Sequence, residues 1–458
     1  MRTEWDSIGS VELPDEACYG TQTERARINF PMTGRTMHPY MIDNLVYIKK
    51  AAAIANLRAG TMRKDISDAI VQACDEILAG NLRDQFIVDP IQGGAGTSAN
   101  MNANEVIACR ATEIMGGARG DWLVHPNDHV NMAQSTNDVF PTAGRMTTLK
   151  LTKELLSSLD RLISAFEAKA IEFRQVPKLG RTQLQDAVPM FLGQEFKANA
   201  TALRRCARRI RRTSEELYSV NLGATAIGTC INASQGYLDC VVDILGQLVN
   251  EPLYQAHDLV DATQYPDGFA ALSSSVRNCM LVLSKIANDM RLLSSGPCGG
   301  IEELRLPAKQ HGSSIMPGKI NPVIPEVVTQ AAFLVAGYDT TIAMAVEAGQ
   351  LELNAFEPVL FYGLFESLLV SAHAMDTFRV NCIEGVEADL EHCRDLLMQS
   401  AAIGTALNPI VGYERATDVV KHALAQHRSV VDVAEEELKM PRSELEKIVK
   451  DCLSEALT

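Results

Sequence analysis

Residues 192–217 read LGQEFKANATALRRCARRIRRTSEEL, and this stretch decides the fold class. Apolar residues recur in it at helical spacing over about seven turns, which is typical of a helix that buries one face. The apolar positions are Leu192, Phe196, Ala200, Leu203, Ala207, Ile210 and Leu217. The opposite face is rich in arginine from residue 204 to 212, and we interpret it as solvated or subunit-facing rather than as an anion-binding surface.

Two further stretches predict long helices. Residues 151–173 repeat apolar side chains at similar spacing, in a helix expected to begin upstream, near Arg145. Another helix is expected to open at Pro325, because the fixed φ of proline suits a first helical turn. Long helices with sparse loops from about residue 140 to 390 predict a helical bundle. We therefore expect a mainly α subunit with a mixed, mostly helical N-terminal domain (1–136), a central long-helix bundle (137–392) and a small helical C-terminal domain (393–458).

Composition narrows the possible partners and compartment. The 458 residues carry a net charge of -15, which argues against nucleic acid or an anionic membrane as a partner. Eleven cysteines occur with no C-x-x-C spacing, so we expect reduced thiols in a cytoplasmic protein. The first residues lack the apolar run of a signal peptide. We also expect no membrane span, since the apolar run 331–349 is interrupted by Asp339 and Glu347.

The richest chemistry lies in residues 312–322, which read GSSIMPGKINP. Two glycines and two prolines predict an irregular loop rather than a helix or strand. The loop nevertheless carries two hydroxyls, an ammonium and an amide, from Ser313, Ser314, Lys319 and Asn321. These groups suit a site that holds a small carboxylate and moves a proton beside it.

Three other polar stretches accompany this loop: GGAGTSANMN at 93–102, HPNDHVNMAQSTND at 125–138 and GRTQLQDAVP at 180–189. Taken singly, each has a plain interpretation as helix caps and turns. The first resembles a nucleotide loop only superficially, because it lacks the P-loop lysine. Their joint occurrence with the 312–322 loop favours one functional site.

In this order and at this spacing, the four stretches resemble the fumarase/aspartase superfamily almost end to end. Residues 180–189, NLGATAIGT at 221–229 and QSTND at 134–138 are most similar to its aspartate ammonia-lyase branch. Gln183, where fumarases carry His, supports that branch. The resemblance implies a homotetramer in which three subunits build each active site around a central helical bundle. It also implies no organic cofactor, although divalent cations activate some members.

The implied reaction is the reversible deamination of L-aspartate to fumarate and ammonia through a dianionic aci-carboxylate. By resemblance, Ser313 accepts the proton. The hydroxyls expected to clamp the β-carboxylate are those of Thr97, Ser135, Thr136 and Ser314. The α-carboxylate is expected to meet Lys319, Asn321 and Thr182, and the leaving amine to meet Asn137 and Gln183.

Three other functions stay open: hydration of fumarate, C–N elimination from another or N-substituted amino acid, and a catalytically silent scaffold. We predict no metal site. His125 and His129 have the i, i+4 spacing of a metal pair, but no third ligand is evident and Pro126 disfavours a regular helix there. Two departures from the family pattern are Cys298, where arginine commonly follows Gly-Pro, and Cys230, which replaces a usual glycine.

Overall fold

The computed structural model describes residues 1–312 and 314–455, with side chains for all of these except 450 and 452–455. Helices hold 63% of the residues, so the expectation of a mainly α chain is confirmed. The chain forms two compact units. Unit 1 contains residues 1–156, 208–278 and 334–371, and unit 2 contains residues 157–207, 279–333 and those from 372 onward. The three-domain division at 136/137 and 392/393 stays a prediction.

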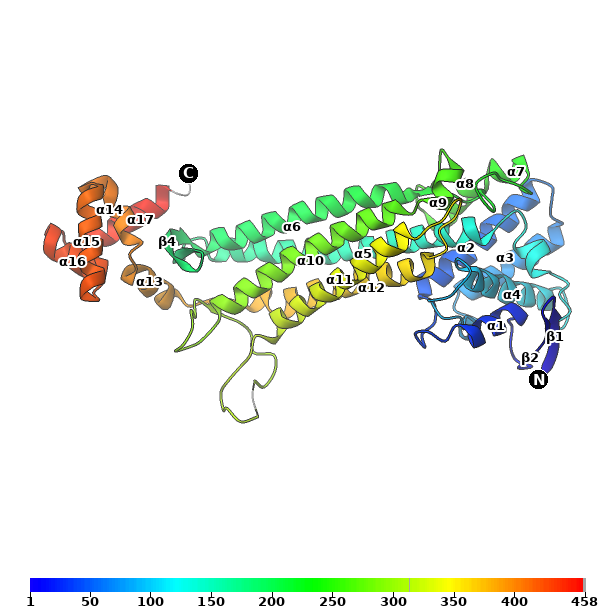
Figure 1. Cartoon of the computed structure of the whole chain (residues 1–458), viewed down its shortest axis with the longest axis horizontal. Coiled ribbons are helices and arrows are strands. Elements are labelled where there is room, and N and C mark those ends of the chain that lie inside the picture. The colour runs from blue at the N-terminus through cyan, green and yellow to red at the C-terminus, as the bar shows by residue number, and fades with distance from the viewer. Residues whose placement is uncertain (313, 456–458) are drawn as a thin grey trace. The chain divides into compact units, whose positions relative to one another are not determined.

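Five long helices are the main elements, drawn as the long ribbons of Figure 1. They are α5 (Thr136–Glu172), α6 (Leu192–Ser214), α10 (Asp267–Leu293), α11 (Val323–Glu347) and α12 (Glu357–Asn381). The limits between the two units fall inside all five, so each helix contributes residues to both units.

The helix predicted from residue 192 is confirmed at its start, and its apolar positions are buried. It ends at Ser214, three residues before Leu217, which lies in the 3-10 turn η3 (Glu215–Tyr218). The helix expected near Arg145 begins nine residues earlier, at Thr136, so that predicted start is wrong. Helix α11 begins at Val323, two residues before Pro325.

Pro141 explains why the start of α5 was hard to predict. Proline inside a helix has no N–H to donate to the carbonyl four residues back, which here is that of Asn137. Asn221 Nδ2 donates to the Asn137 carbonyl instead, at 3.0 Å. A side chain from a distant segment therefore replaces the missing backbone bond, and the helix continues through the proline.

The N-terminal part of unit 1 combines one hairpin with four helices. Strands β1 (Arg2–Asp6) and β2 (Gly9–Leu13) pair antiparallel, from Arg2↔Leu13 to Asp6↔Gly9. The helices are α1 (Thr21–Asn29), α2 (Pro39–Arg58), α3 (Lys64–Leu78) and α4 (Thr97–Ile114), with the 3-10 turn η1 (Arg83–Gln85) before α4 and the π-helical turn η2 (Pro126–Val130) after it. Helix α2 packs against α3, and α3 packs against α4.

Shorter elements complete unit 1. Strands β5 (Ser219–Val220) and β6 (Tyr254–Gln255) pair in parallel. Helices α7 (Gln235–Leu238), α8 (Val241–Val249) and α9 (Leu259–Gln264) lie in the same stretch of chain, which leads into α10.

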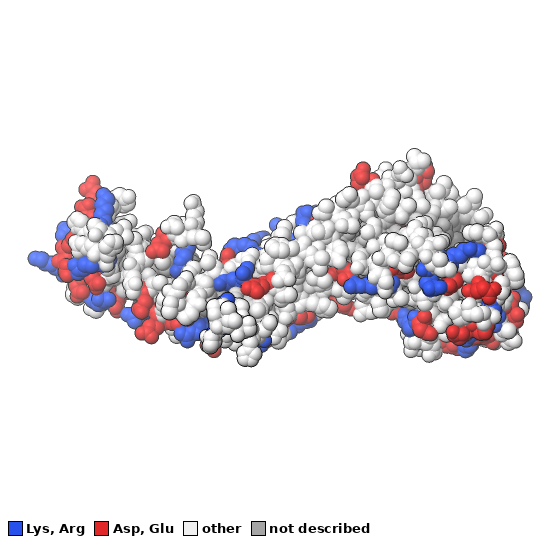
Figure 2. All heavy atoms as spheres, turned by 60° about the horizontal axis from the view of Figure 1, so that its bottom comes forward, with Lys and Arg blue, Asp and Glu red and all other residues white. Residues whose placement is uncertain are grey.

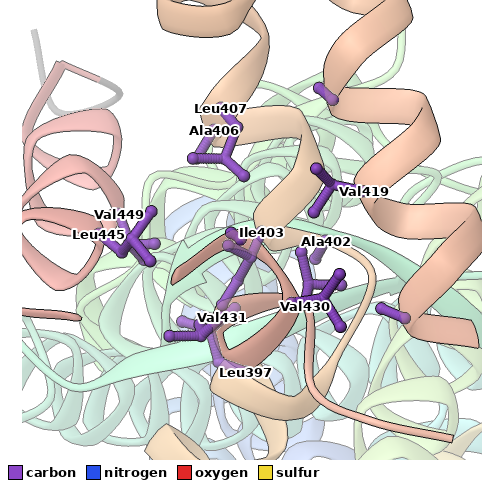
Figure 3. Packing of buried hydrophobic residues seen from close by; sticks show 14 of the residues in the cluster. Leu397, Ala402, Ile403, Ala406, Leu407, Val419, Val430, Val431, Leu445 and Val449 are labelled. Carbon is purple, nitrogen blue, oxygen red and sulfur yellow. The ribbon is translucent and has the colours of Figure 1, made fainter. Parts of the chain in front are cut away.

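Unit 2 holds two further strand pairs and the C-terminal helices. Strands β3 (Pro177–Thr182) and β4 (Gln185–Phe191) form a hairpin, and β7 (Leu304–Arg305) pairs with β8 (Glu387–Ala388), which follows the 3-10 turn η4 (Ile383–Gly385). The C-terminal helices are α13 (Leu390–Gln399), α14 (Ile403–Val411), α15 (Tyr413–Gln426), α16 (Val430–Leu438) and α17 (Arg442–Glu455). They share a hydrophobic cluster in which Ile403, Val431 and Leu445 are buried (Figure 3).

Two helical runs, Val323–Glu347 and Glu357–Gly385, are long and apolar enough to span a membrane by length and composition alone. The expectation from sequence had set this possibility aside because of Asp339 and Glu347. Core helices pass the same test, and the second run is 67% buried within the chain. The first is only 33% buried, so α11 exposes apolar side chains that this single chain leaves uncovered.

Acidic and basic side chains lie interspersed on the face drawn in Figure 2. The surplus of 57 acidic over 42 basic residues is therefore not gathered into one block on that face. Mixed charge of this kind favours solubility over attraction to a polyanion.

Candidate active site

Thr97 is the first residue of α4. Gly96, just before it, has a φ of +90°, and a Cβ at this position would lie 2.4 Å from the Phe140 ring, so the turn requires glycine. The Thr97 hydroxyl donates to the Gly94 carbonyl at 2.6 Å. The hydroxyl thus stands at the amino-terminal end of a long helix, where the helix dipole favours a negative ligand.

Ser135, Thr136 and Asn137 open α5 through a reciprocal cap. Asn137 N donates to Ser135 Oγ at 3.2 Å, while Ser135 N donates to Asp138 Oδ1 at 2.9 Å. A serine followed three residues later by an acid is the sequence signature of such a capping box. The cap fixes the backbone of the three candidate residues at the start of the helix.

A hydrogen bond joins the starts of α4 and α5. Asn100 Nδ2 donates to Thr136 Oγ1 at 3.1 Å, and Asn100 lies one turn after Thr97. Asn137 Nδ2 is also held, since it donates to the Ala226 carbonyl at 2.7 Å. The structure therefore brings the candidate residues of unit 1 to two adjoining helix starts, an arrangement that suits a carboxylate.

Lys49 supports this arrangement, and the sequence had not singled it out. Its ammonium donates to Asn131 Oδ1 and to Gln134 Oε1, both at 2.9 Å. Asn100 and Asn104 also donate to Asn131 Oδ1, each at 3.2 Å. Lys49 is fully buried, and this burial lowers its pKa to about 7. A lysine on the apolar stripe of α2 was the signal that could have identified it.

Asp138 connects the start of α5 to the 221–225 segment. Its Oδ2 accepts from Gly223 N and Thr225 N, both at 3.0 Å, so the 221–225 segment is tied to α5. Burial raises the pKa of Asp138 to about 6, against the opposing effect of the backbone N–H groups and of Lys49. Asp138 lies inside the QSTND motif at 134–138, but the sequence alone indicated no role for it.

Thr182 and Gln183 lie on the β3–β4 hairpin of unit 2, and both are exposed. Thr182 pairs with Gln185, so Gln183 and Leu184 form a two-residue turn, with φ of 54° and 63°. Two successive positive φ values define the turn type that matches strand twist, and it usually takes Asn-Gly. Gln and Leu there store backbone strain, which is common at functional positions.

A buried ion cluster supports the base of this hairpin. Glu303 is fully buried and pairs with Arg181 at 3.0 Å and with Lys178 at 3.1 Å. Lys178 also pairs with Glu195 at 2.7 Å. Two cations and two carboxylates therefore balance one another, as buried charges require. The cluster fixes the strand that ends at Thr182.

Ser314, Lys319 and Asn321 lie in the 306–322 segment, which forms no helix or strand over its described residues, as expected. Ser313, the expected proton acceptor, lies outside the described residues. Asn321 Nδ2 donates to the Gly312 carbonyl at 2.9 Å and so closes the loop. Lys319 and Asn321 line a cavity of 530 Å³ together with residues 294–297 and Arg305. Ser314 and Lys319 are exposed.

The structure thus arranges the candidates in two groups. Thr97 and residues 135–137 lie together in unit 1, at the starts of α4 and α5. The hairpin residues Thr182 and Gln183 and the loop residues Ser314, Lys319 and Asn321 belong to unit 2, on two separate segments. Their catalytic roles stay predictions.

His125 and His129 form part of a π-helical turn, so the doubt about a regular helix at Pro126 is confirmed. His125 N donates to His129 Nδ1 at 2.8 Å, and Asp128 N donates to His125 Nδ1 at 3.1 Å. One nitrogen of each ring is therefore occupied by backbone. Burial also lowers the pKa of His129.

The two departures from the family pattern lie in different settings. Cys230 has a φ of 57°, a left-handed conformation that glycine adopts more easily, which explains why glycine is usual there. Its N–H donates to the Ala224 carbonyl at 3.1 Å. Cys298 is exposed, directly after the residues 294–297 that line the Lys319 cavity.

Known proteins resemble this chain over nearly its whole length. Residues 9–337 match the lyase family model, and residues 403–451 match the model of the fumarase C C-terminus. The chain is 49% identical to an aspartate ammonia-lyase of Bacillus subtilis, over 98% of this chain and 94% of the relative.

Two solved structures are similar over 98% of both chains. A fumarate lyase of Brucella melitensis, described as a delta crystallin bound to cobalt, has a TM-score of 0.95 at 48% identity. A class II fumarase of Schistosoma mansoni has a TM-score of 0.92 at 34% identity. Sequence and fold lead to the same conclusion: the chain belongs to the lyase family of aspartate ammonia-lyases and fumarases.

Proposed function

We propose that this chain eliminates ammonia reversibly from L-aspartate to give fumarate. The observation that carries the proposal is the 49% identity to an aspartate ammonia-lyase over 98% of the chain. The match to a class II fumarase is weaker, at 34% identity, so hydration of fumarate ranks second. The chain acts as a carbon–nitrogen lyase.

The chemistry begins with the proton on the carbon beside the β-carboxylate. Ser313, as an alkoxide, takes this proton, and the electron pair moves into the β-carboxylate to give a dianionic aci-carboxylate. The pair then returns to form the carbon–carbon double bond while the C–N bond breaks and ammonia leaves. Stabilising the dianion is the main task, and donors fixed in advance do this best.

Each candidate residue has a place in this scheme. The hydroxyls of Thr97, Ser135, Thr136 and Ser314 bind the β-carboxylate. Two adjoining helix starts hold three of these four hydroxyls, which supports their role with a doubly negative group.

Other residues bind the α-carboxylate and the amine of the substrate. Lys319 and Asn321, with Thr182, bind the α-carboxylate, and Asn137 and Gln183 face the leaving amine. Lys319 is an exposed cation on a glycine-flanked loop, which supports its availability for a carboxylate.

The site is completed by several chains in a homotetramer. Two observations support this part of the proposal. The candidate residues occur on four separated segments, and α11 exposes Val327, Phe333, Leu334 and Met344. Apolar side chains grouped on one helix need a covering surface, and a second copy of the same helix supplies one. The described cysteines form no disulfide bond, which supports a cytoplasmic location.

Ultraviolet absorbance of fumarate tests the activity directly. Purified protein is incubated in separate samples with L-aspartate, with L-malate and without substrate. We expect fumarate only with L-aspartate. Turnover of malate alone would establish a hydratase instead. Turnover of neither compound would reject both enzyme assignments in favour of another amine substrate or a silent scaffold.

The base is tested by Ser313→Ala, with the exposed Ser164→Ala on α5 as the matched control. We expect the first variant to lose at least about 10³-fold in kcat, because it removes the proposed base. The control should keep its rate, and both should keep the native oligomeric state. A Ser313→Ala enzyme with near-native kcat would remove serine from the base role.

A further inference from the structure

Two buried thiols meet in unit 1, away from the candidate active site. Cys18 lies between β2 and α1, and Cys109 lies in α4, more than three turns beyond Thr97. Their side chains are 0% and 2% exposed, and the two sulfur atoms lie 2.8 Å apart. A disulfide needs a separation of about 2.05 Å, so less than about 1 Å of movement would join them.

The backbone of Cys18 is fixed on both sides. Arg2 donates to the carbonyls of Ala17 and Tyr19, at 2.8 and 3.0 Å. Cys18 N donates to Gln85 Oε1 at 2.7 Å. Just beyond it, the fully buried Glu105 of α4 accepts from Gly20 N at 2.8 Å. The segment is therefore held against α4, and the close approach of the sulfurs follows from the surrounding structure.

Charged groups surround the thiol pair. Glu113, one turn beyond Cys109, pairs with Arg110 at 2.8 Å and with Arg119 at 2.7 Å. The hydrogen bond with Cys109 lowers the pKa of Cys18, and the nearby Arg119 adds to that effect against the opposing burial. Cys18 is thus the thiol of the pair that more readily becomes a thiolate.

A metal ion is the competing interpretation, because the ligand atoms of Cys18, Cys109 and Glu113 lie within 4.8 Å of one another. Two thiolates on one tetrahedral zinc, each bonded at about 2.3 Å, stand about 3.8 Å apart. The observed 2.8 Å is too short for that arrangement. The carboxylate of Glu113 is also already paired with two arginines. The geometry fits sulfur–sulfur bonding better than shared coordination.

We propose that Cys18 and Cys109 form a reversible disulfide when hydrogen peroxide reaches them. The Cys18 thiolate attacks the peroxide oxygen, which gives a sulfenic acid and releases hydroxide, or water once a proton is taken up. Cys109 then displaces water from the sulfenic acid and forms the S–S bond. The two thiols lose two electrons and two protons, and the peroxide is reduced to two waters. A dithiol reductant reverses the change.

The bond links residues 18 and 109 and closes the chain between them. A cross-link over so long a loop restricts the unfolded chain, so the oxidised protein should have the higher Tm. The first strands and the 14–20 segment become covalently attached to α4. Cys109 lies far along α4 from Thr97, so turnover should be unchanged by oxidation.

Mass spectrometry of the full chain tests the proposal. Native protein is treated with hydrogen peroxide, unfolded, alkylated and digested without reductant. We expect a linked pair of peptides containing Cys18 and Cys109, about 2 Da lighter than the two reduced peptides together, which disappears after dithiothreitol. Two fewer thiols should titrate than the eleven of the reduced chain. Peroxide that oxidises the exposed Cys298 while Cys18 and Cys109 both remain alkylatable would overturn the proposal.

Three variants assign the effect to this pair. Cys18→Ala and Cys109→Ala should each show no peroxide-dependent rise in Tm and no linked peptide. Cys74→Ala, an equally buried thiol in α3, is the matched control and should keep both. A rise in Tm that survives in Cys18→Ala would show that another pair is responsible. Because the peptide is sought first in the wild-type chain, a variant that folds poorly does not decide the outcome.

Discussion

At Asn131, three side-chain donors converge on a single oxygen. Lys49 supplies one of them, and Asn100 and Asn104 supply the others. Asn100 also donates to Thr136, so the position of a candidate clamping hydroxyl depends on a lysine that is itself fully buried. Networks of this kind hold reacting groups in place before the substrate arrives.

Replacing Lys49 by Met should therefore reduce turnover although the lysine is not catalytic. Loss of the ammonium leaves the oxygens of Asn131 and Gln134 with fewer donors, at about 1–3 kcal/mol for an unmet buried group. We expect kcat/KM to fall about tenfold or more, mainly through kcat, because Thr136 loses its fixed position. Steady-state kinetics of L-aspartate turnover measure this.

Lys50→Met is the matched control for that change. Lys50 is the next residue of α2 and pairs with the half-exposed Asp75 at the surface, where an ion pair contributes little. Its kinetics should stay close to wild type. A Lys49→Met enzyme with native kcat and a lowered Tm would show that the lysine serves stability alone.

Site residues could be predicted from the sequence where they lie in short polar motifs. They could not be predicted where their role depends on how the helices pack. Thr97, residues 135–137 and Lys319 lie in stretches whose polar composition stood out. Lys49 falls on the apolar stripe of α2 and Lys50 does not, but only the packing of α2 against its neighbours shows that the first is buried. No pattern in the chain distinguishes the two lysines as directly as their burial does.

Among the elements, α5 shows how a helix depends on a distant residue. Its true start lies before Pro141, a residue that normally argues for a break. The compensating donor, Asn221, is far away in sequence. Local propensity therefore placed the start too late, while the apolar repeat of residues 151–173 predicted the rest correctly.

The packing of α5 on α12 gives a prediction at this scale. A Cβ on Gly144 would lie 2.0 Å from the Phe361 ring, a contact that a fully buried ring cannot relieve without moving its neighbours. Gly144→Ala should destabilise the fold by about 1–3 kcal/mol through overpacking. Thermal or denaturant unfolding measures the change.

Gly363→Ala, in the partner helix α12, provides the comparison. A Cβ there meets Ile342 and Tyr338 at 3.5 Å, which is ordinary contact. This exchange should be neutral or stabilise by up to about 1 kcal/mol, because alanine is the better helix former. Equal stabilisation by both substitutions would contradict the packing argument at Gly144.

For the molecule as a whole, the exposed side of α11 is the feature that a single chain does not explain. Phe333 is 65% exposed and Met344 is 68% exposed. We expect light scattering after size-exclusion chromatography to give the mass of a tetramer. Phe333→Asp combined with Met344→Asp should dissociate it, since buried charge opposes association. Turnover should then be lost, because the proposed sites take residues from several chains.

Leu424→Asp, on the exposed side of α15, is the control for that pair. It introduces the same charge at an apolar position outside the long helices and should leave the assembly and its turnover intact. If the double variant is a monomer with native activity, the sites are not shared between subunits. If it remains a tetramer, the contact lies elsewhere on the chain.

Fold class and family were accessible from sequence because helical periodicity and four ordered motifs extend over most of the chain. The sequence set a membrane span aside at residues 331–349 because of Asp339 and Glu347, although α11 passes the test of length and apolarity. In the structure Asp339 is buried and pairs with Arg277 at 2.7 Å and with Ser273 at 2.7 Å. A carboxylate that is buried and paired within the fold does not break an apolar helix, although the sequence alone suggests that it would.

The turn at Gln183 and Leu184 has a consequence for how this protein could change its substrate. Both residues hold a left-handed backbone, which disfavours β-branched side chains and is best tolerated by Gly, Asn, Asp and His. Substitutions at position 183 by Gly, Asn, Asp or His should therefore cost the least backbone strain. A library that places Gly, Asn, Asp and His at position 183 would sample most of the side chains that this turn can accept.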